Sequence, residues 1–285
     1  MNKIITLIAT GILFSACQKH NNGSEKDQLT TQEKIVIPAA ARSDSRIITQ
    51  DDRYNTFYGP AVQFGEGHVR SWVNISHDDK PLAIGIEFTD GVLQQQHEHD
   101  PGDASHGHEV LLTLHQKTKE LMPFDHLTMG FMAAGHPPPG IYSVPHFDFH
   151  FYKMRLEERI AIPPYPLAMA AFNHNPPAGH LPPAYAKSPA GEAKMGAHWM
   201  DVLSPEFNGQ PFTHTFVYGS YDGKVNFLEP MATLAFLIEG KGVQKAIRQP
   251  QFFDPINKYY PTRYNIWENE DKKRHYLALD EMVLR

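Results

Sequence analysis

The sequence predicts a mainly β fold: one antiparallel sandwich or barrel-like domain, jelly-roll or cupin-like variants included, with long proline-rich loops. Residues 142–152, Y-S-V-P-H-F-D-F-H-F-Y, alternate between apolar and polar with period two, which is typical of a β-strand. The 23 prolines and 20 glycines disfavour a helical bundle. With 285 residues, 41% of them hydrophobic, the chain can bury one large core, and all-β domains of this length often stay single.

The first 17 residues predict a lipoprotein signal. Lys3 precedes an apolar run from Ile4 to Phe14, which is too short to span a bilayer, and the run ends in Ser15-Ala16-Cys17. This end resembles a bacterial lipobox, which implies cleavage before Cys17 and its acylation. An uncleaved anchor or a plain secretory signal are the alternatives. We therefore expect a lipoprotein that membrane lipid holds through Cys17, on the periplasmic side or at the cell surface.

Residues 18–46 are polar and are expected to form a flexible tether, so the β-rich domain would occupy 47–285. Cys17 is the only cysteine, which excludes disulfides and thiol chemistry from the domain. The first strands expected in the domain are 67–76 and 80–89, joined as a hairpin by the polar turn 77–79.

Residues 94–108 carry four histidines around a Pro-Gly turn. Short histidine-rich tracts can collect metal, but ordering so polar a loop costs about 1–2 kcal/mol per residue, so a solvated insertion is the main interpretation. The next segment, 109–119, fits a helix or a strand. Residues 125–132 then read as a strand, followed by the stiff turn 135–140.

After the central strand, residues 153–159 are charged and fit a short helix. Residues 173–189 are too rich in proline for regular structure, and we expect a rigid flap that can cover a site. Residues 212–218 and 224–229 are expected to pair through a tight turn at Asp222-Gly223, and 259–267 with 275–279 as a closing hairpin.

Several segments resemble an uncharacterised bacterial family, the TTHB-type domain of unknown function first named from a Thermus thermophilus protein. They are G-H-P-P-P-G-I-Y-S-V-P-H-F-D-F-H-F-Y (135–152), M-G-A-H-W-M-D-V-L-S-P-E-F (195–207), P-F-T-H-T-F-V-Y-G-S-Y-D-G (211–223), F-L-E-P-M (227–231) and Y-Y-P-T-R-Y-N-I (259–266). The histidine-rich insertion departs from the family. The resemblance implies one β-rich extracytoplasmic domain over about residues 60–280 and supplies no activity.

The central strand carries the predicted metal ligands. His146, Asp148 and His150 share the face opposite three phenylalanines, and imidazole and carboxylate suit divalent zinc, iron or manganese. At about 3.3 Å per residue, positions i and i+4 lie about 13 Å apart, so a flat strand cannot bring both histidines to one ion. We expect a bulge, or a pair of ligands with the third residue orienting them.

Ligands from elsewhere are expected to complete one mononuclear centre. His198 and Glu229 would complete the coordination sphere, and Asp201 would fix an imidazole or act as general base. His136 could lean over this centre, although a surface or capping role is the commoner one. The set is similar to the cupin arrangement of His-x-His with a distant Glu and His, but the spacing departs from it. A purely hydrogen-bonded polar face is the alternative.

Two classes of function follow: a hydrolase or oxygenase with an open metal position, or a non-enzymatic lipoprotein that binds metal or a small-molecule ligand. The net charge of −6 gives no overall basic field for nucleic acid. The sequence has no serine nucleophile elbow, phosphate-binding glycine loop or CxxC pair. It leaves the substrate and homo-oligomer formation open.

Overall fold

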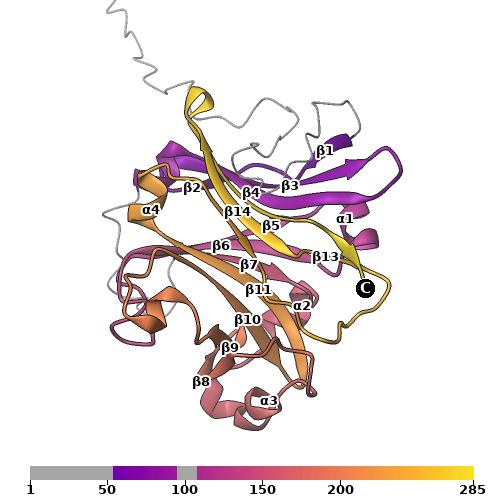
Figure 1. Cartoon of the computed structure of the whole chain (residues 1–285), viewed down its shortest axis with the longest axis vertical. Coiled ribbons are helices and arrows are strands. Elements are labelled where there is room, and N and C mark those ends of the chain that lie inside the picture. The colour runs from indigo at the N-terminus through magenta and orange to yellow at the C-terminus, as the bar shows by residue number, and fades with distance from the viewer. Residues whose placement is uncertain (1–53, 95–107) are drawn as a thin grey trace, which may run out of the picture.

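Two antiparallel β-sheets packed face to face form the domain in the computed structural model, which describes residues 54–94 and 108–285 (Figure 1). Each sheet has seven strands, and neither closes into a barrel within the described residues. The structure therefore confirms the predicted mainly β class and fits the sandwich version of it.

Sheet A, the upper layer in Figure 1, has the order β1-β3-β4-β15-β14-β12, with β2 paired to β3. Its strands are β1 (Tyr54–Tyr58), β2 (Val62–Phe64), β3 (Gly67–Ser76), β4 (Pro81–Thr89), β12 (Val243–Ala246), β14 (Arg263–Asn269) and β15 (Arg274–Asp280).

Sheet B, the lower layer, has the order β5-β6-β7-β11-β10-β9-β8. Its strands are β5 (His108–Thr113), β6 (His126–Met132), β7 (His146–Tyr152), β8 (Tyr185–Glu192), β9 (Gly196–Asp201), β10 (His214–Tyr221) and β11 (Lys224–Thr233). A separate two-stranded sheet pairs β13 (Tyr259–Tyr260) with β16 (Val283–Leu284).

Short helices connect the strands. The α-helices are α1 (Gln116–Leu121), α2 (Leu156–Ile160), α3 (Met169–Asn173) and α4 (Leu234–Ile238), and the 3-10 helices are η2 (Asp90–Gln94), η3 (Tyr165–Leu167), η4 (Pro205–Asn208) and η5 (Glu270–Lys272). Among the described residues, no helix combines the length and the apolar character that a membrane crossing needs.

The three predicted hairpins are present as β3–β4, β10–β11 and β14–β15. Asp222 and Gly223 both have positive φ, as a tight turn at this position requires. The sequence allowed either a helix or a strand for the segment 109–119. In the structure it contains most of β5 and the start of α1. The segment 153–159 does contain the start of α2.

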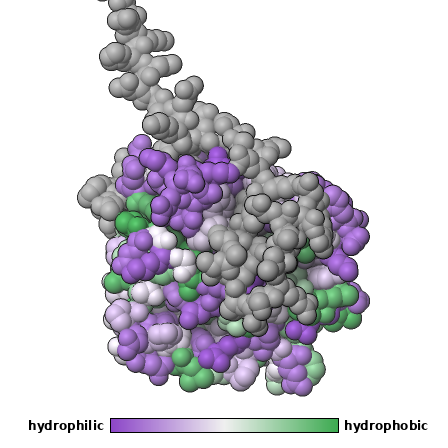
Figure 2. Space-filling view, turned by 45° about the horizontal axis from the view of Figure 1, so that its top comes forward, coloured by the Kyte–Doolittle hydropathy of each residue, from purple (hydrophilic) through white to green (hydrophobic). Residues whose placement is uncertain are grey.

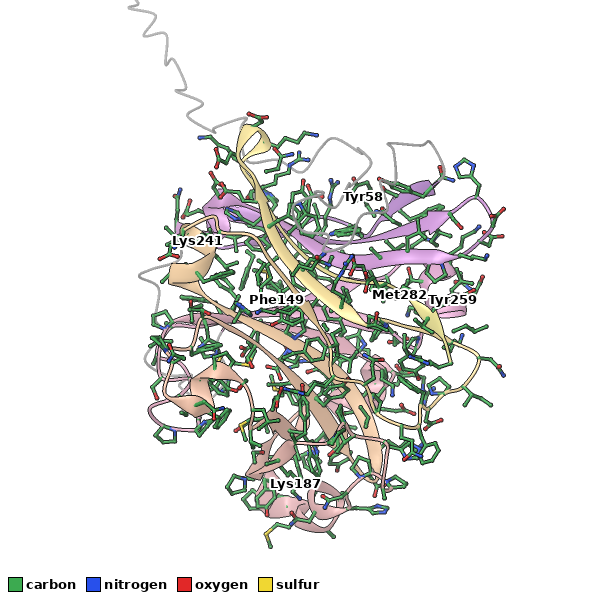
Figure 3. All side chains as sticks on the ribbon, in the orientation of Figure 1. Tyr58, Phe149, Lys187, Lys241, Tyr259 and Met282 are labelled. Atoms are coloured by element: carbon green, nitrogen blue, oxygen red, sulfur yellow. The ribbon has the colours of Figure 1, made fainter. Side chains whose placement is uncertain are left out.

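The main core lies between the sheets and is built around β7. Phe147, Phe149 and Phe151 are all fully buried, and Phe147 and Phe149 both stack against Phe88 of sheet A. Figure 3 shows Phe149 in the interior, surrounded by side chains of both layers. The aromatic face of the central strand therefore supplies core, as its sequence predicts.

The opposite face of β7 differs from the expected half-buried strand. His146, Asp148 and His150 are 0%, 5% and 1% exposed. A second apolar cluster covers the outer face of sheet B, where rings from the connecting loops pack against strand side chains. It consists of Tyr142, Phe212, Val217 and Met231, with Ile141, Met200 and Phe207 at its edge. The alternation thus separates an apolar from a polar face of β7, and the polar face is buried as well.

The proline-rich segment also needs correction, because it is not irregular throughout. Its last residues enter β8, and Pro189 lies inside that strand. A proline is tolerated there because β8 is the edge of sheet B and needs no further ladder donor on its outer side. On the face that Figure 2 shows, apolar residues occur in small groups among polar ones.

The predicted signal with Cys17, the tether 18–46 and residues 95–107 of the histidine-rich insertion lie outside the described residues. Their proposed roles stay predictions.

The core position of Phe149 predicts a large stability loss on truncation. Phe149→Ala should lower the free energy of unfolding by about 3–5 kcal/mol, because it removes ring contacts with both sheets and leaves a cavity. Ile160→Ala is the control: Ile160 is 57% exposed and its truncation should cost no more than about 0.5 kcal/mol. Urea unfolding at equilibrium measures both, and equal losses would contradict the assigned core.

Candidate metal centre

The centre lies on the outer face of sheet B, where β7 and β11 run side by side. Phe151 pairs with Leu228 and Asp148 with Met231, which sets His150 opposite Glu229. Side chains opposite each other on paired strands share a face. The register of two central strands therefore brings an imidazole and a carboxylate together from positions 79 residues apart in the sequence.

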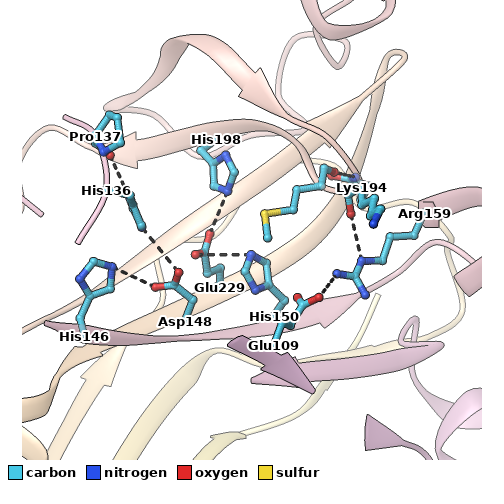
Figure 4. Close-up of polar contacts among 12 residues, drawn as sticks. Glu109, His136, Pro137, His146, Asp148, His150, Arg159, Lys194, His198 and Glu229 are labelled. Atoms are coloured by element: carbon cyan, nitrogen blue, oxygen red, sulfur yellow. Dashed lines mark hydrogen bonds and ion pairs between the residues drawn. The ribbon is translucent and has the colours of Figure 1, made fainter. Parts of the chain in front are cut away.

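Glu229 also contacts a second imidazole, which comes from β9. Glu229 Oε1 lies 3.5 Å from His150 Nε2, and Glu229 Oε2 lies 3.5 Å from His198 Nε2 (Figure 4). His198 reaches across β10, whose residue opposite it is Gly219. These three residues, which we call the Glu229 triad, each offer a ligand atom within 4.8 Å of the others.

An aromatic ring fixes the two imidazoles of the Glu229 triad. The Phe227 ring packs edge-on against His150 at 5.0 Å and against His198 at 5.2 Å between ring centroids. A Cβ at Gly219 would overlap the Phe227 ring. Glycine at position 219 is therefore what allows Phe227 to lie between the two ligand histidines.

A second group, the Asp148 triad, lies beside the first. Asp148 Oδ1 is 3.2 Å from His146 Nε2, and Asp148 Oδ2 is 3.6 Å from His136 Nε2. His136 comes from the stiff loop before β7, where it packs edge-on against the His146 ring at 4.7 Å. The three ligand atoms also lie within 4.8 Å of one another.

Backbone carbonyls orient both imidazoles of the Asp148 triad. His146 Nδ1 lies 2.6 Å from the carbonyl oxygen of Val144, and His136 Nδ1 lies 2.7 Å from that of Pro137. A carbonyl only accepts, so both Nδ1 atoms carry the hydrogen. In the neutral imidazoles, each Nε2 then turns a lone pair toward a carboxylate oxygen. Carbonyl-bound Nδ1 with free Nε2 is the arrangement in which proteins hold metal-binding histidines.

Several of these buried polar atoms have no hydrogen-bond partner among the described residues. They are His146 Nε2, Asp148 Oδ1, His150 Nδ1, His150 Nε2 and Glu229 Oε2. Buried polar atoms without partners are rare and costly. A cation in each triad would satisfy four of these atoms, His146 Nε2, Asp148 Oδ1, His150 Nε2 and Glu229 Oε2, and nitrogen and oxygen ligands about 2.0–2.1 Å from a tetrahedral ion are about 3.3 Å apart. The separations of 3.2–3.6 Å fit this spacing.

Burial decides the charge states in the Glu229 triad. It lowers the pKa of His150 to about 4 and that of His198 to about 3, so both imidazoles are neutral with free lone pairs at pH 7. Burial also raises the pKa of Glu229, with help from the charges of Asp148 and Glu109. Without a cation, the triad therefore favours a protonated carboxylate.

The Asp148 triad has the opposite balance. Burial opposes ionisation of Asp148, but His146 and His136 outweigh it and hold the pKa of this carboxyl well below its usual range. In the same way, the charge of Asp148 outweighs the burial of His136 and raises the pKa of that imidazole. The carboxylate is thus ionised, and either a proton or a metal ion balances it.

A further ion pair ends the row of charges. Arg159 Nη2 contacts Glu109 Oε2, and Arg159 Nε donates to the carbonyl oxygen of Lys194 at 2.9 Å (Figure 4). The Arg159 guanidinium also lies 4.4 Å from the centroid of the Tyr152 ring. Glu109 is therefore neutralised by its own partner, unlike Asp148 and Glu229.

The structure places all five predicted metal ligands in the two triads, and His136 is the one further residue that completes them. His146 and Asp148 belong to one triad, and His150, His198 and Glu229 to the other. The five do not meet at one point, because β7 has no bulge between His146 and His150. This is the separation that the strand rise demands.

Asp201 lies apart from both triads. Alternation along β9 puts it on the face opposite His198. Its Oδ2 accepts from Arg248 Nε at 2.6 Å and its Oδ1 from the Leu203 amide at 3.0 Å. The predicted role as general base or imidazole partner therefore needs correction: Asp201 holds a loop through Arg248.

Sequence reasoning gave His136 a surface or capping role as the commoner one, yet it contacts Asp148. The available signal was the rigid turn that leads directly into the ligand strand.

A third group, Asp90, Glu268 and His275, was not predicted. There, His275 Nε2 and Asp90 Oδ1 form an ordinary hydrogen bond of 3.1 Å. These two atoms already have partners, unlike the facing atoms of the two triads.

Comparisons of the chain with models of protein families, with curated proteins and with solved structures found no match. The resemblance to the TTHB-type domain therefore stays a prediction.

The depressed pKa values predict acid sensitivity of the metal-free protein. His150 has a pKa of about 4 when folded and 6.5 as the ordinary value, so its contribution to stability is complete above pH 6.5 and is lost as the pH falls through about 4. His150→Gln should therefore lose less free energy of unfolding between pH 6.5 and 4 than the unmodified chain. Urea unfolding after treatment with a chelator measures this.

The control for the acid experiment is His174→Gln. His174 is 65% exposed and pairs with Asp222 at the surface, so its curve should follow that of the unmodified chain. Parallel curves for His150→Gln and the unmodified chain would show that His150 titrates normally in the fold.

Proposed function

We propose that this chain is an extracytoplasmic metalloprotein that binds a divalent transition metal, zinc, iron or manganese, at the Glu229 and Asp148 triads. The observation that carries the proposal is the pair of triads in which carboxylate oxygens face imidazole nitrogens at 3.2–3.6 Å, where four of these atoms are buried and lack a hydrogen-bond partner among the described residues. Two imidazoles and a carboxylate are borderline ligands that suit these ions. The donor atoms fit in type, number and spacing.

The number of protein ligands favours an enzyme over a structural metal site. Structural zinc sites have four protein ligands, whereas catalytic sites have three and keep a position open for water or substrate. Each triad supplies three residues. A bound ion in such a site supplies a Lewis acid that activates water for hydrolysis or, with iron, a place for dioxygen.

The chain's own residues would prepare this chemistry. His150 and His198 are neutral at pH 7 and need lose no proton, whereas Glu229 must give one up when a cation enters. The imidazoles of His198 and His136 are 18% and 23% exposed, and the other four ligand side chains are nearly buried. Solvent and substrate would therefore approach past these two histidines.

A second candidate function is non-enzymatic binding of metal or a small ligand at the membrane surface. The observation in its favour is the low exposure of the ligands, since four of the six side chains are at most 7% exposed. An ion held so deeply suits capture and storage as well as catalysis. The histidine-rich segment 94–108 would then add a looser, buffering site.

The first 17 residues supply the proposed address. Ser15-Ala16-Cys17 after an apolar run is the basis for an acylated Cys17 that anchors the protein in membrane lipid, facing the periplasm or the cell exterior. The TTHB-type resemblance supports the same extracytoplasmic setting. A small-molecule ligand and homo-oligomer formation both fit this proposal.

Metal content is the direct test. The purified chain, loaded with zinc and dialysed, should contain two equivalents by elemental analysis. His198→Ala and His136→Ala should each contain about one, because each removes one ligand from a different triad, and His174→Ala should keep both.

Deletion of residues 94–108 should leave both equivalents in place. The proposal would be overturned if this deletion removed all metal while His198→Ala and His136→Ala had no effect. Such a result would assign the binding to the histidine-rich segment.

Activity separates the enzyme from the storage protein. If the centre is hydrolytic, the zinc-loaded chain should cleave an activated ester or phosphoester such as 4-nitrophenyl acetate or 4-nitrophenyl phosphate, and His198→Ala should lower this rate at least about 100-fold. Oxygen consumption by the iron-loaded chain tests the oxygenase version. A full complement of metal without either activity would favour the binding protein.

A further inference from the structure

A cavity unrelated to the triads opens at one end of the sandwich. It has a volume of about 220 Å³, and its lining includes Lys153, Pro176, Gln249, Phe252, Asp254 and Tyr260. Tyr218 and Leu228, which also line it, pack into the core between the sheets. This Lys153 cavity therefore lies on the inner side of sheet B, whereas both triads lie on the outer side.

The walls of the Lys153 cavity are held by the backbone. The amides of Gln251 and Phe252 both donate to the carbonyl oxygen of Gly179 at 2.9 Å, which joins the proline-rich segment to the loop after β12. A Cβ at Gly179 would overlap the Phe252 ring, so the two loops are in close contact. The rigid flap expected at 173–189 thus covers this cavity.

A cation without an anion lines the cavity. Lys153 Nζ forms no hydrogen bond or ion pair of 4.0 Å or less with any residue of the described part of the chain, and its printed contact is with the Tyr260 ring, 5.6 Å from the centroid. Burial lowers the pKa of Lys153 to about 8, with Asp254 opposing the effect, so the ammonium is still mostly charged at pH 7. The ammonium is thus half-buried with its nearest lining carboxylate, Asp254, beyond ion-pair distance.

A fixed amide and a carboxylate also belong to the lining. The Gln249 side-chain nitrogen donates to the carbonyl oxygens of Ile247 at 3.0 Å and Pro261 at 3.2 Å, which fixes the amide. The carboxylate of Asp254 is exposed and supplies an acceptor to the lining.

The rest of the lining is apolar. Proline rings at 176, 177, 250 and 261 and the aromatic rings at 252 and 253 offer flat surfaces to a hydrocarbon group. The volume is below the roughly 300–1,000 Å³ of pockets for drug-sized ligands, so the cavity has room for a small molecule only.

We propose that the Lys153 cavity binds a free amino acid with an apolar side chain. The ligand carboxylate would pair with Lys153 Nζ, its ammonium group would donate to Asp254, and its side chain would lie against the proline and aromatic rings. Lys153 and Asp254 then each gain a partner of opposite charge. The proposal does not rest on the metal centre, and it assigns a role to the proline-rich flap.

Calorimetry with the full chain tests the proposal. L-phenylalanine should bind, and phenethylamine, which lacks the carboxylate, and L-phenylalaninamide, in which it is masked, should each bind at least tenfold more weakly. Phenylacetate, which lacks the ammonium group, should also bind more weakly. Equal binding of L-phenylalanine and phenethylamine, or no binding of L-phenylalanine and L-leucine, would overturn the proposal without any variant.

Variants then locate the ligand. Lys153→Met, which keeps the length and removes the charge, should raise the Kd for L-phenylalanine at least tenfold. Lys241→Met is the matched control, because Lys241 pairs with Glu239 and lies far from Tyr259 in Figure 3. An unchanged Kd in Lys153→Met would place the ligand elsewhere. Because the Lys153 cavity lies on the inner side of sheet B and both triads lie on its outer side, the bound zinc of this variant should be unchanged.

Discussion

Two carboxylates that face imidazole lone pairs inside the protein are the constraint on which the site depends. Asp148 and Glu229 are 5% and 1% exposed, so both carboxyl groups are largely withdrawn from bulk water. Bringing acceptors together in a medium of low polarity costs free energy unless a cation lies between them. A proton can serve in both triads: at Asp148 the charge raises the pKa of His136, and at Glu229 burial raises the pKa of the carboxyl group, while His150 and His198 stay neutral. We propose that a divalent ion takes the place of these protons.

The scaffold makes this arrangement by using both faces of one strand. Phe147, Phe149 and Phe151 anchor β7 to sheet A, while the alternate residues point outward beneath a second apolar layer that includes Tyr142 and Phe212. The strong inner packing fixes the strand, so the register with β11 places Glu229 opposite His150. A one-residue slip would turn every ligand into the core, and the cost of burying charge among phenylalanines opposes it.

Much of the fold was predictable because it is local. Period-two alternation located β7, and turn residues such as Asp222-Gly223 located the hairpins. The second layer over the outer face was not predictable, since it is built from rings at 142, 207 and 212 that are adjacent only after folding. For the same reason the alternation alone did not reveal that the polar face of β7 is buried. Pro189 was read as a strand breaker because nothing local shows that β8 is an edge strand.

The candidate site divides in the same way. The strand rise is a local quantity, and together with the absence of a bulge in β7 it accounts for the separation of His146 and His150 into different triads. Which residues complete each triad depends on strand order: His198 reaches Glu229 across Gly219, and Asp201, three residues later, faces the other way toward Arg248. The contact of His136 with Asp148 could be found only once the path of the proline-rich loop before β7 was known. Spacing in the sequence identified the ligand types, and only the sheet order could pair them.

Anomalous X-ray diffraction from crystals of the zinc-loaded protein, recorded on both sides of the zinc edge, tests the central claim most directly. The account predicts two peaks, one about 2.0–2.1 Å from the ligand nitrogens of His150 and His198, and one at the same distance from those of His136 and His146. Direct hydrogen bonds between these imidazoles and the two carboxylates, with no peak at either triad, would contradict it.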